Sequence, residues 1–196
     1  MGILMAEMMT EFASMPWDYK KLDDDFVDFF KNRIDQNLSV IDLGCGSGSQ
    51  SWQLEQLGFD VTATDNKNVL QHDIKKFILD DALDSKLNKK YDIIIDRALI
   101  HGLWTDKNKH KYFEMINNIT HDKSIILLKV MSQYEVRFNN IGGPYRFTEE
   151  QLTKLYSGLN FKCVKLIDTY IYSNNIQPYL RGYFSIYKKE GIPERE

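Results

Sequence analysis

Several features that mark special classes of protein are missing from this sequence or scarce in it. It has two cysteines, Cys45 and Cys163, which are too few for a disulfide framework, and we expect both to be reduced thiols in a cytoplasmic protein. Positive charge is not in excess: the formal net charge is −3 and the pI is near 5.8, so no electrostatic footprint for nucleic acid is present. No apolar stretch is long enough to span a bilayer, and we expect no membrane partner.

The chain also lacks the marks of a divided or repetitive protein. It has four prolines, no Pro/Gly/Ser-rich linker and no internal repeat. Its N-terminus carries neither the basic region nor the long apolar core of a secretory signal. With 196 residues, of which 43% are hydrophobic and 13% aromatic, it is long enough to bury a core. We therefore expect a single domain over residues 1–196, with residues 1–36 forming an N-terminal helical cap.

The most informative segment that is present is Val40–Gly48, which reads V-I-D-L-G-C-G-S-G. A short apolar run ends here in glycines at alternate positions, Gly44, Gly46 and Gly48. A buried parallel strand has such a run, and glycines at its carboxyl end let the backbone turn tightly against a ligand. The segment therefore predicts a strand followed by a ligand-binding loop.

A second strand follows and ends in an acidic residue about twenty residues after the glycines. The segment Gly58–Asp65 reads G-F-D-V-T-A-T-D. Strand, glycine loop, helix, strand and acid is the layout of a nucleotide-type pocket. In such a pocket the carboxylate of Asp65 accepts hydrogen bonds from both ribose hydroxyls.

The glycine spacing bears on which ligand the pocket would hold. A dinucleotide fingerprint is G-x-G-x-x-G, whereas the spacing here is G-x-G-x-G, with Ser49 next. Asp42 lies inside the strand end, where a carboxylate suits a cationic ligand or its amino group better than an anionic pyrophosphate. The alternative is an ordinary strand–turn–helix that binds nothing.

This segment closely resembles motif I of class I S-adenosylmethionine (SAM) methyltransferases, which is a hydrophobic pair, an acid, an apolar residue and then G-x-G-x-G. The resemblance implies SAM as the cofactor and S-adenosylhomocysteine as its product. It places the cofactor against Asp42 and the glycine loop, Cys45 included, and against Asp65 and Asn66.

Strands and helices alternate along the chain, which is typical of a doubly wound sheet. We expect strands at 39–43, 61–64, 69–73, 91–96, 124–131, 161–171 and 179–187. We expect helices at 23–35, 49–57, 74–83 and 109–119, and a further helix after Thr148, which can form a capping box with Gln151. The fold class is thus α/β: a Rossmann-like, doubly wound, mostly parallel seven-stranded sheet with an antiparallel last strand.

The connection between the second and third strands is shortened. Too few residues separate Asp65 from Val69 for a crossover helix, so either the third strand is rudimentary or residues 69–71 form a loop. In the resembling family, an acid–apolar pair here reads the adenine: its carboxylate contacts the exocyclic amine and the next backbone N–H contacts a ring nitrogen. Asp73 and Ile74 occupy that place in the sequence; alternatively, Asp73 caps the next helix.

A third group of residues follows the fourth expected strand, at the carboxyl edge where open α/β sheets bind ligands. Asp96, Arg97 and His101 resemble the D-R-x-x-x-H segment of small-molecule methyltransferases, the thiopurine and thiol/halide-like group. Residues 16–18, P-W-D, resemble a segment common in that group. The resemblance implies Asp96 and Arg97 in the cofactor site, and Arg97 either pairs with Asp96 or Asp18 or holds an anionic substrate.

His101 has two interpretations. Methyl transfer is an in-line displacement, in which a base helps only when the acceptor must lose a proton. Histidine titrates near neutrality, and in the catalytic interpretation His101 is that general base. In the structural interpretation it hydrogen-bonds to backbone and orders the loop after the strand.

Aromatic side chains are candidates for the acceptor pocket, because they can surround a sulfonium or stack on a flat acceptor, although each alone is more often part of a core. The candidates are Trp17, Trp104, Tyr134 and Tyr145. The segment Met1–Ser14 has apolar residues at helical spacing and either packs on the core or forms a lid. We expect no metal site, because the histidines lack partners at ligand spacing.

These observations predict a SAM-dependent methyltransferase that acts on a small-molecule acceptor. The lack of a basic surface and of an added recognition domain favours a small molecule over nucleic acid. The alternatives are a methyltransferase that acts on protein or RNA, and a non-catalytic SAM-binding protein. Nothing in the sequence indicates the acceptor atom or the oligomeric state.

Overall fold

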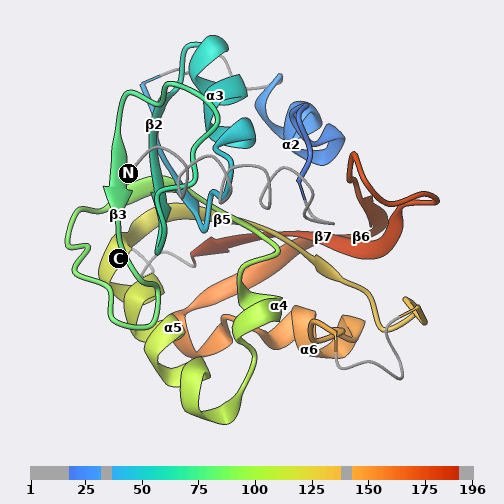
Figure 1. Ribbon diagram of the computed structural model, residues 1–196. Helices are drawn as coiled ribbons and strands as arrows, with labels where there is room; N and C mark the ends of the chain where they lie inside the picture. Colours follow the sequence, from blue (N-terminus) through green and yellow to red (C-terminus); the bar gives the residue numbers. More distant parts are fainter. Residues whose placement is uncertain (1–17, 32–36, 138–142, 190–196) are drawn as a thin grey trace.

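A seven-stranded sheet runs through the part of the chain that the computed structural model describes, residues 18–31, 37–137 and 143–189 (Figure 1). The spatial order of the strands is β3-β2-β1-β4-β5-β7-β6. Their bounds are β1 Ser39–Leu43, β2 Asp60–Asp65, β3 Phe77–Leu79, β4 Tyr91–Arg97, β5 Thr120–Met131, β6 Phe161–Ile171 and β7 Leu180–Lys189.

The first five strands of the chain pair in parallel, whereas β7 runs antiparallel to both β5 and β6. Asp42 of β1 lies level with Ala63 of β2 and Ile95 of β4, so the carboxyl ends of these strands share one edge. The strand order reverses between β1 and β4, which is the switch point where open α/β sheets bind ligands. The expected fold class, with its antiparallel last strand, is confirmed.

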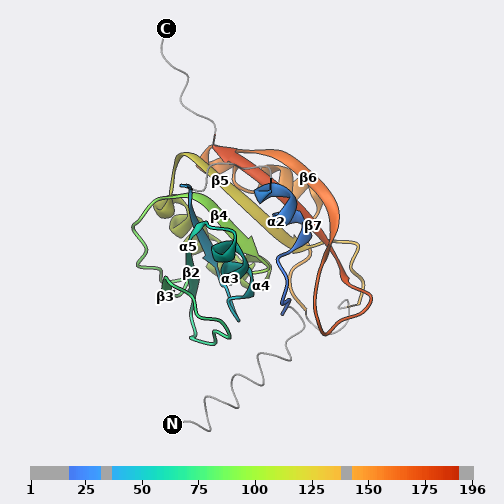
Figure 2. The same ribbon diagram turned by 90° about the horizontal axis from the view of Figure 1, so that it is seen from above.

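Helices cover both faces of the sheet: α2 and α3 lie on one face, and α4, α5 and α6 lie on the other (Figure 1). Figure 2 shows the same layers from above, with β3 near one edge and β6 near the other. The helix bounds are α2 Asp24–Phe30, α3 Ser49–Gln56, α4 Ile100–Leu103, α5 Asp106–Ile119 and α6 Glu149–Lys154. Phe26 of α2 and Leu54 of α3 belong to the core cluster on one face of the sheet. Tyr112, Ile116 and Leu152 belong to the core cluster on the other face.

Local signals in the sequence explain where several helices begin and end. The capping box of Thr148 and Gln151 starts α6, as expected. Gly58, with φ of 91°, follows the last turn of α3 in the left-handed conformation that ends many helices. Thr105 caps α5, whose apolar face carries Tyr112 and Met115 into the core.

The expected strand at 69–73 and the expected helix at 74–83 are wrong. Residues 66–76 form neither helix nor strand, and β3 occupies Phe77–Leu79, inside the expected helix. The spacing of apolar residues from Ile74 onward imitates a helical face, but the chain there is extended and pairs with β2. As expected from its length, the β2–β3 connection holds no crossover helix.

Some expectations concern residues that are not described. Residues 1–17 and 32–36 lie outside the described residues, so the helical cap over 1–36 and the core-or-lid alternatives for Met1–Ser14 stay predictions. Within the described ranges, no helix combines the length and the apolar character needed to cross a bilayer.

Candidate functional site

The loop between β1 and α3 passes repeatedly through the left-handed region of backbone conformation. Gly44, Gly46 and Gly48 have φ angles of 65°, 54° and 78°. Residues with a Cβ rarely adopt such angles. At Gly44 a Cβ would also lie 2.9 Å from Cδ1 of Leu99. The loop can therefore approach closely whatever occupies the space around it.

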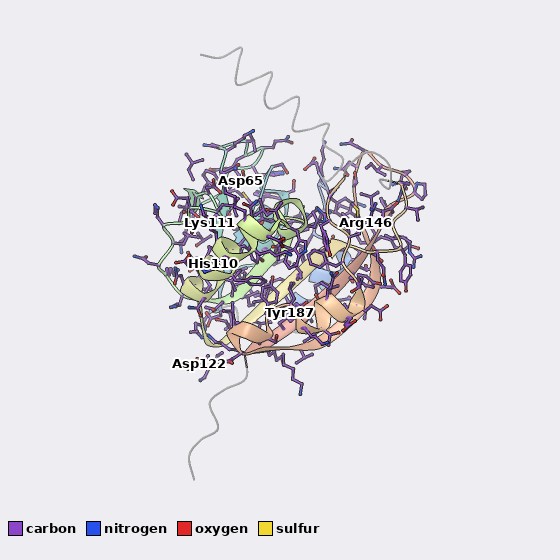
Figure 3. All side chains as sticks on the ribbon, turned by 90° about the horizontal axis from the view of Figure 1, so that it is seen from below. Asp65, His110, Lys111, Asp122, Arg146 and Tyr187 are labelled. Carbon is purple, nitrogen blue, oxygen red and sulfur yellow. The ribbon has the colours of Figure 1, made fainter. Side chains whose placement is uncertain are left out.

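Three cavities open around this loop at the carboxyl edge of the sheet, and Gly44 lines all three. We call them the first, second and third cavities, in the order in which they are described below. Figure 3 shows Asp65 toward this end of the molecule and Asp122 toward the opposite end. Gly44 is thus the residue of the loop that the three cavities share.

The first cavity is rich in carboxylate and hydroxyl groups. Its lining residues are Asp18, Tyr19, Asp42, Gly44, Cys45, Gly46, Ser47, Ser49, Gln50 and Arg97. Asp18 is buried, and its Oδ1 accepts a hydrogen bond from the Ser47 hydroxyl at 2.7 Å. Its Oδ2 is buried too but has no hydrogen-bond partner in the described part of the chain. Because an unpaired buried carboxylate oxygen is costly, this arrangement suits a ligand that brings a donor.

Asp42 is the second buried carboxylate of this cavity. The Ser51 hydroxyl donates to its Oδ2 at 2.6 Å. Burial raises the pKa of Asp42 to about 6, although the Ser51 hydrogen bond opposes the shift. A cation beside Asp42 would stabilise its charged form. Asp42 therefore lies where the sequence places it, at the end of β1 beside the glycine loop.

Cys45 supports the glycine loop through its backbone amide, and its thiol makes no ion pair with a described residue. Its amide donates to the Thr64 carbonyl at 2.9 Å, which ties the loop to β2. Burial, together with the nearby charge of Asp42, raises the pKa of the Cys45 thiol, so the thiol stays protonated. It lines the cavity as a neutral group.

The segment before α2 supplies Asp18 and Tyr19 to the lining of the first cavity. Gln50 of α3 holds this segment: its Oε1 accepts from the Asp23 amide at 2.8 Å and its Nε2 donates to the Lys21 carbonyl at 2.7 Å. Asp18 and Tyr19 are thereby held over the glycine loop. Sequence reasoning did not place Asp18, Tyr19 or Gln50 in the site; the P-W-D resemblance was the one signal near them.

The second cavity lies between the ends of β1, β2 and β3. Its lining residues are Leu43, Gly44, Thr64, Asp65, Asn66, Asp80, Asp81, Ala82, Leu99 and Leu103. Asp65 accepts hydrogen bonds from the Gly46 amide at 2.9 Å and from the Lys67 amide at 3.0 Å, which orient its carboxylate. Asp65 and Asn66 therefore lie beside the glycine loop, as expected.

Asp73 and Ile74 lie outside the second cavity. The side chain of Asp73 is exposed, and Ile74 Cγ1 lies 3.2 Å from the place where a Cβ on Gly48 would be. Because the third strand is β3, the acid–apolar pair near its end is Asp81 and Ala82, and both line the second cavity. Asp73 and Ile74 thus lie apart from the cavity that Asp65 lines, and their expected role at the adenine stays a prediction.

The third cavity has a volume of about 280 Å³, and most of the residues that line it are apolar or have small side chains. Its lining residues are Gly44, Asp65, Arg97, Ala98, Leu99, His101, Gly102, Leu103 and Pro144. It shares Asp65 with the second cavity and Arg97 with the first. A small ligand there would touch anything bound along the glycine loop.

His101 is 8% exposed, and its Nδ1 accepts a hydrogen bond from the Met131 amide at 3.2 Å. A neutral imidazole that accepts at Nδ1 carries its proton on Nε2. Burial, and secondarily the charge of Arg97, lowers the pKa of His101 to about 3, so the ring is neutral near pH 7. The His101 carbonyl also accepts from the Tyr145 amide at 2.8 Å. This geometry favours the ordering interpretation over the general base, because neither ring nitrogen offers a free lone pair.

Arg97 belongs to a buried ion cluster that sequence reasoning missed. Its Nε donates to Asp23 at 3.2 Å, so the described carboxylate that pairs with it is Asp23 rather than Asp96 or Asp18. Lys129, which is fully buried in β5, also pairs with Asp23. A lysine inside the apolar strand Ser124–Met131 is the signal that could have pointed to buried carboxylates nearby.

Asp96 points to the opposite face of β4 from Arg97. It is fully buried, and it accepts hydrogen bonds from the Tyr112 hydroxyl at 2.7 Å and from the Leu99 amide at 2.8 Å. Burial raises the pKa of Asp96 to about 6. Asp96 lines none of the three cavities, and its carboxylate accepts from the amides at the start of α4, so its role in cofactor binding stays a prediction.

Three of the four aromatic residues expected in the acceptor pocket lie in the described part of the chain. The Trp104 and Tyr145 rings pack together in the core cluster with their centroids 5.6 Å apart. Tyr134 is 48% exposed and lies beneath the guanidinium of Arg181. None of these three aromatic residues lines a cavity of the site. Trp17 lies outside the described residues.

Solved structures with the same fold come from several organisms. A SAM-dependent methyltransferase from Anabaena variabilis is 17% identical, with a TM-score of 0.71 over 94% of this chain and 93% of that one. One from Methanosarcina mazei is 15% identical, with a TM-score of 0.68 over 84% and 98% of the two chains. The 1,6-didemethyltoxoflavin-N1-methyltransferase of Burkholderia thailandensis is 15% identical, with a TM-score of 0.60 over 94% and 88%. At these identities the likeness establishes the fold.

The family is established by the sequence itself. No curated protein sequence matches the chain. The family described as a methyltransferase domain, however, matches residues 15–166, which is most of the chain and includes the glycine loop, Asp65 and β4. The chain therefore belongs to the methyltransferase domain family, with the fold of a class I enzyme.

Proposed function

We propose that this protein transfers a methyl group from SAM to a small-molecule acceptor and releases S-adenosylhomocysteine. The observation that carries the proposal is the meeting of three chemically different cavities at Gly44. The first cavity offers carboxylates, the second offers carboxylates between apolar walls, and the third is mostly apolar and open to a second ligand. These match an ammonium-bearing tail, an adenosine and an acceptor, respectively.

The first cavity fits the amino-acid tail of SAM. The buried Oδ2 of Asp18 lacks a partner among the described residues, and an ammonium group would supply the missing donor. The carboxylate of Asp42 stands in the same lining and would favour the same positive charge. The glycine loop offers the close backbone approach that such a tail requires.

The second cavity fits the adenosine. Asp65 is oriented by two backbone amides, and we assign it to the ribose hydroxyls. We assign the adenine to Asp81 and Ala82, which follow β3 as an acid and an apolar residue. Leu99 and Leu103, in the lining of the second and third cavities, would flank the base and separate it from the acceptor.

The bound donor supplies an electrophilic methyl group on a sulfonium. The protein supplies proximity: Gly44, Asp65 and Arg97 each line the third cavity together with a donor cavity, so an acceptor would lie against the donor. Ala98, Leu99 and Pro144 help to exclude water from this contact. A small acceptor is favoured by the cavity volume of about 280 Å³ and by the toxoflavin-type substrate named for the Burkholderia relative.

The test begins with calorimetric titration of the protein with SAM and S-adenosylhomocysteine, followed by incubation with methyl-labelled SAM and a panel of small metabolites. We expect both ligands to bind and label to appear in a small product. If neither SAM nor S-adenosylhomocysteine binds, the proposal is wrong. Binding with no labelled product from any acceptor class would favour the non-catalytic SAM-binding protein.

A substitution at Asp18 tests whether this residue binds the amino-acid tail of SAM. Asp18→Asn should weaken S-adenosylhomocysteine binding about ten- to hundredfold, because a charge-assisted hydrogen bond to the ammonium is worth about 1.5–3 kcal/mol. Binding of 5′-methylthioadenosine, which lacks the amino-acid tail, should not change. Asp84→Asn, at an exposed carboxylate outside the cavities, is the control for the charge change. Equal weakening of both ligands by Asp18→Asn would contradict the assignment.

A further inference from the structure

We propose that His101 is a specificity-determining residue of the third cavity, where its Nε2–H group donates a hydrogen bond to the acceptor. The inference rests on the proposed function, because it concerns the second substrate of that reaction. It names the substrate class as an uncharged, mostly apolar molecule that carries a carbonyl oxygen or a pyridine-type ring nitrogen.

The first observation is the protonation state of the His101 ring. The Met131 amide donates to Nδ1 at 3.2 Å, so Nδ1 is the accepting nitrogen of a neutral ring and the proton is on Nε2. Burial lowers the pKa of His101 to about 3, so the ring stays neutral near pH 7. Nε2 is therefore a hydrogen-bond donor and cannot take a proton from the acceptor.

The second observation is that solvent reaches Nε2. Among the described residues, the side-chain nitrogen and oxygen atoms that are buried without a partner belong to Asp18, Gln71 and Arg146. Nε2 of His101 is not one of them, although it makes no hydrogen bond with a described residue. It is therefore open to solvent, and the cavity that His101 lines is the third one. A ligand in this cavity can accept a hydrogen bond from Nε2–H.

Contacts on two sides hold His101 in place. Met131, the last residue of β5, binds the ring, and the Tyr145 amide donates to the His101 carbonyl at 2.8 Å. Pro144, which precedes Tyr145, lines the same cavity as His101. A donor that is already fixed loses little conformational entropy when a ligand binds to it. His101 is thus pre-organised for recognition.

Most of the remaining lining is apolar or lacks a side chain. These residues are Gly44, Ala98, Leu99, Gly102, Leu103 and Pro144. Nothing lies within 4 Å of the place where a Cβ on Gly102 would be, so there is open space on this side of α4. Apolar walls with few polar groups suit a compact apolar ligand that is oriented by a hydrogen bond.

The two charged residues of the lining already have partners. The Arg97 Nε donates to Asp23, and the carboxylate of Asp65 accepts from two backbone amides. The proposed function also assigns Asp65 to the ribose. Neither charge requires a counterion from the acceptor. A neutral hydrogen-bond acceptor would therefore satisfy Nε2–H without burying a further charge.

Matched pairs of neutral probes test the inference on the protein saturated with S-adenosylhomocysteine. Acetophenone and α-methylstyrene differ in a carbonyl oxygen, and quinoline and naphthalene differ in a ring nitrogen. In NMR titrations we expect the hydrogen-bonding member of at least one pair to bind about three- to tenfold more tightly, as for one neutral hydrogen bond. The pair that discriminates identifies the kind of hydrogen-bonding atom. Benzoate, the charged probe, should bind no more tightly than acetophenone.

Nitrogen NMR of the wild-type protein locates the contact without a variant. At pH 7, Nε2 of His101 should be protonated and Nδ1 unprotonated. The Nε2–H resonance should shift more with the hydrogen-bonding probe than with its apolar partner. His110, whose side chain is 85% exposed, is the internal control in the same spectrum and should shift with neither probe.

Variants place the probes in the third cavity. His101→Leu should bind the two members of each pair equally well, whereas His110→Leu should keep the preference. Gly102→Leu should put a side chain into the open space beside α4 and weaken the binding of all four neutral probes. Gly158→Leu is its control, because nothing lies within 4 Å of that Cβ position either and Gly158 lines none of the three cavities.

The outcomes separate this inference from the proposed function. If S-adenosylhomocysteine does not bind, the proposed function is wrong and the inference falls with it. If it binds, but neither pair discriminates, benzoate binds more tightly than acetophenone, or His101→Leu keeps the preference, the inference is wrong while the proposed function stands. A protonated Nδ1 on His101 would also overturn the inference, and that result depends on no variant.

Discussion

Gly44 is subject to two structural requirements of the site at once, one on backbone conformation and one on space for a ligand. Its φ of 65° is in the left-handed region, and Leu99 leaves no room for a Cβ. The residue also lines all three cavities. Backbone conformation and ligand approach therefore require the same absence of a side chain, which explains why the glycine motif is so informative in the sequence.

Substitution of Gly44 should affect both stability and binding. Gly44→Ala is expected to lower the free energy of unfolding by about 1–2 kcal/mol, the cost of a left-handed residue with a Cβ, and to weaken S-adenosylhomocysteine binding. Gly158→Ala is the control, because nothing lies within 4 Å of its Cβ position. Urea denaturation and calorimetry measure the two effects. Similar behaviour of the two variants would contradict this account.

His101 illustrates how one hydrogen bond can change the meaning of a residue. The sequence places a histidine after a strand at the ligand edge, and both a base and a backbone anchor fit that position. The Met131 amide donates to Nδ1, and this hydrogen bond favours the backbone anchor. This amide comes from β5, thirty residues away in the chain, so no local pattern could have revealed it.

At the scale of elements, α4 is a short helix that depends on a buried acid. Asp96 accepts from the amides of Leu99 and Ile100 at the start of α4, while Tyr112 of α5 donates to the same carboxylate. Since α4 carries His101, these contacts position the wall of the third cavity. Asp96 thus acts on the site through the helix.

Removing the Tyr112 hydroxyl tests this support. Tyr112→Phe should lower the free energy of unfolding by about 1 kcal/mol or somewhat more, because Asp96 and the Tyr156 hydroxyl each lose a buried partner. Tyr134→Phe, at a half-exposed ring, should change little. Thermal and urea unfolding provide the measurement. An unchanged Tyr112→Phe protein would show that the Asp96 carboxylate does not rely on this contact.

The β2–β3 connection shows the limit of periodicity in short elements. The β3 strand is three residues long, and among the described strands it pairs only with β2. A three-residue strand cannot establish an alternating pattern, and neighbouring apolar residues gave a helical spacing by chance. Because the strand was expected too early in the chain, the acid–apolar pair expected near its end was Asp73 and Ile74, whereas the pair that follows β3 is Asp81 and Ala82.

For the whole molecule, buried titratable groups make stability depend on pH in opposite directions. Burial raises the pKa of Asp42 and Asp96 to about 6, so the folded state binds more protons than the unfolded state between about pH 4 and 6, and these groups lower stability as pH rises. His101, with a pKa lowered to about 3, binds fewer protons when folded, so its contribution falls as pH drops below about 6.5.

A comparison with His101→Gln isolates the histidine contribution. The stability of the wild type relative to this variant should rise by up to about 1.4 kcal/mol per pH unit between pH 4 and 6 and be level above pH 7. Gln keeps an acceptor for the Met131 amide and does not titrate. Urea denaturation at a series of pH values measures the difference, and a constant difference across this range would refute a neutral buried His101.

The sequence by itself determined most of the order of strands and helices outside the segment between β2 and β4, the glycine loop, and the acids at the ends of β1 and β2. These follow from local causes: apolar runs, left-handed turns and caps act within a few residues, and parallel strands bring their carboxyl ends to one edge. The positions of Asp42 and Asp65 could therefore be predicted.

Only the tertiary structure decided what the polar groups between the elements do. Asp18 meets Ser47, Lys129 meets Asp23, and His101 meets Met131 across long stretches of chain. Such partners depend on how elements pack, and burial then sets the charge of each group. For this reason the donor side of the site could be anticipated from the motif, while the chemistry facing the acceptor could not.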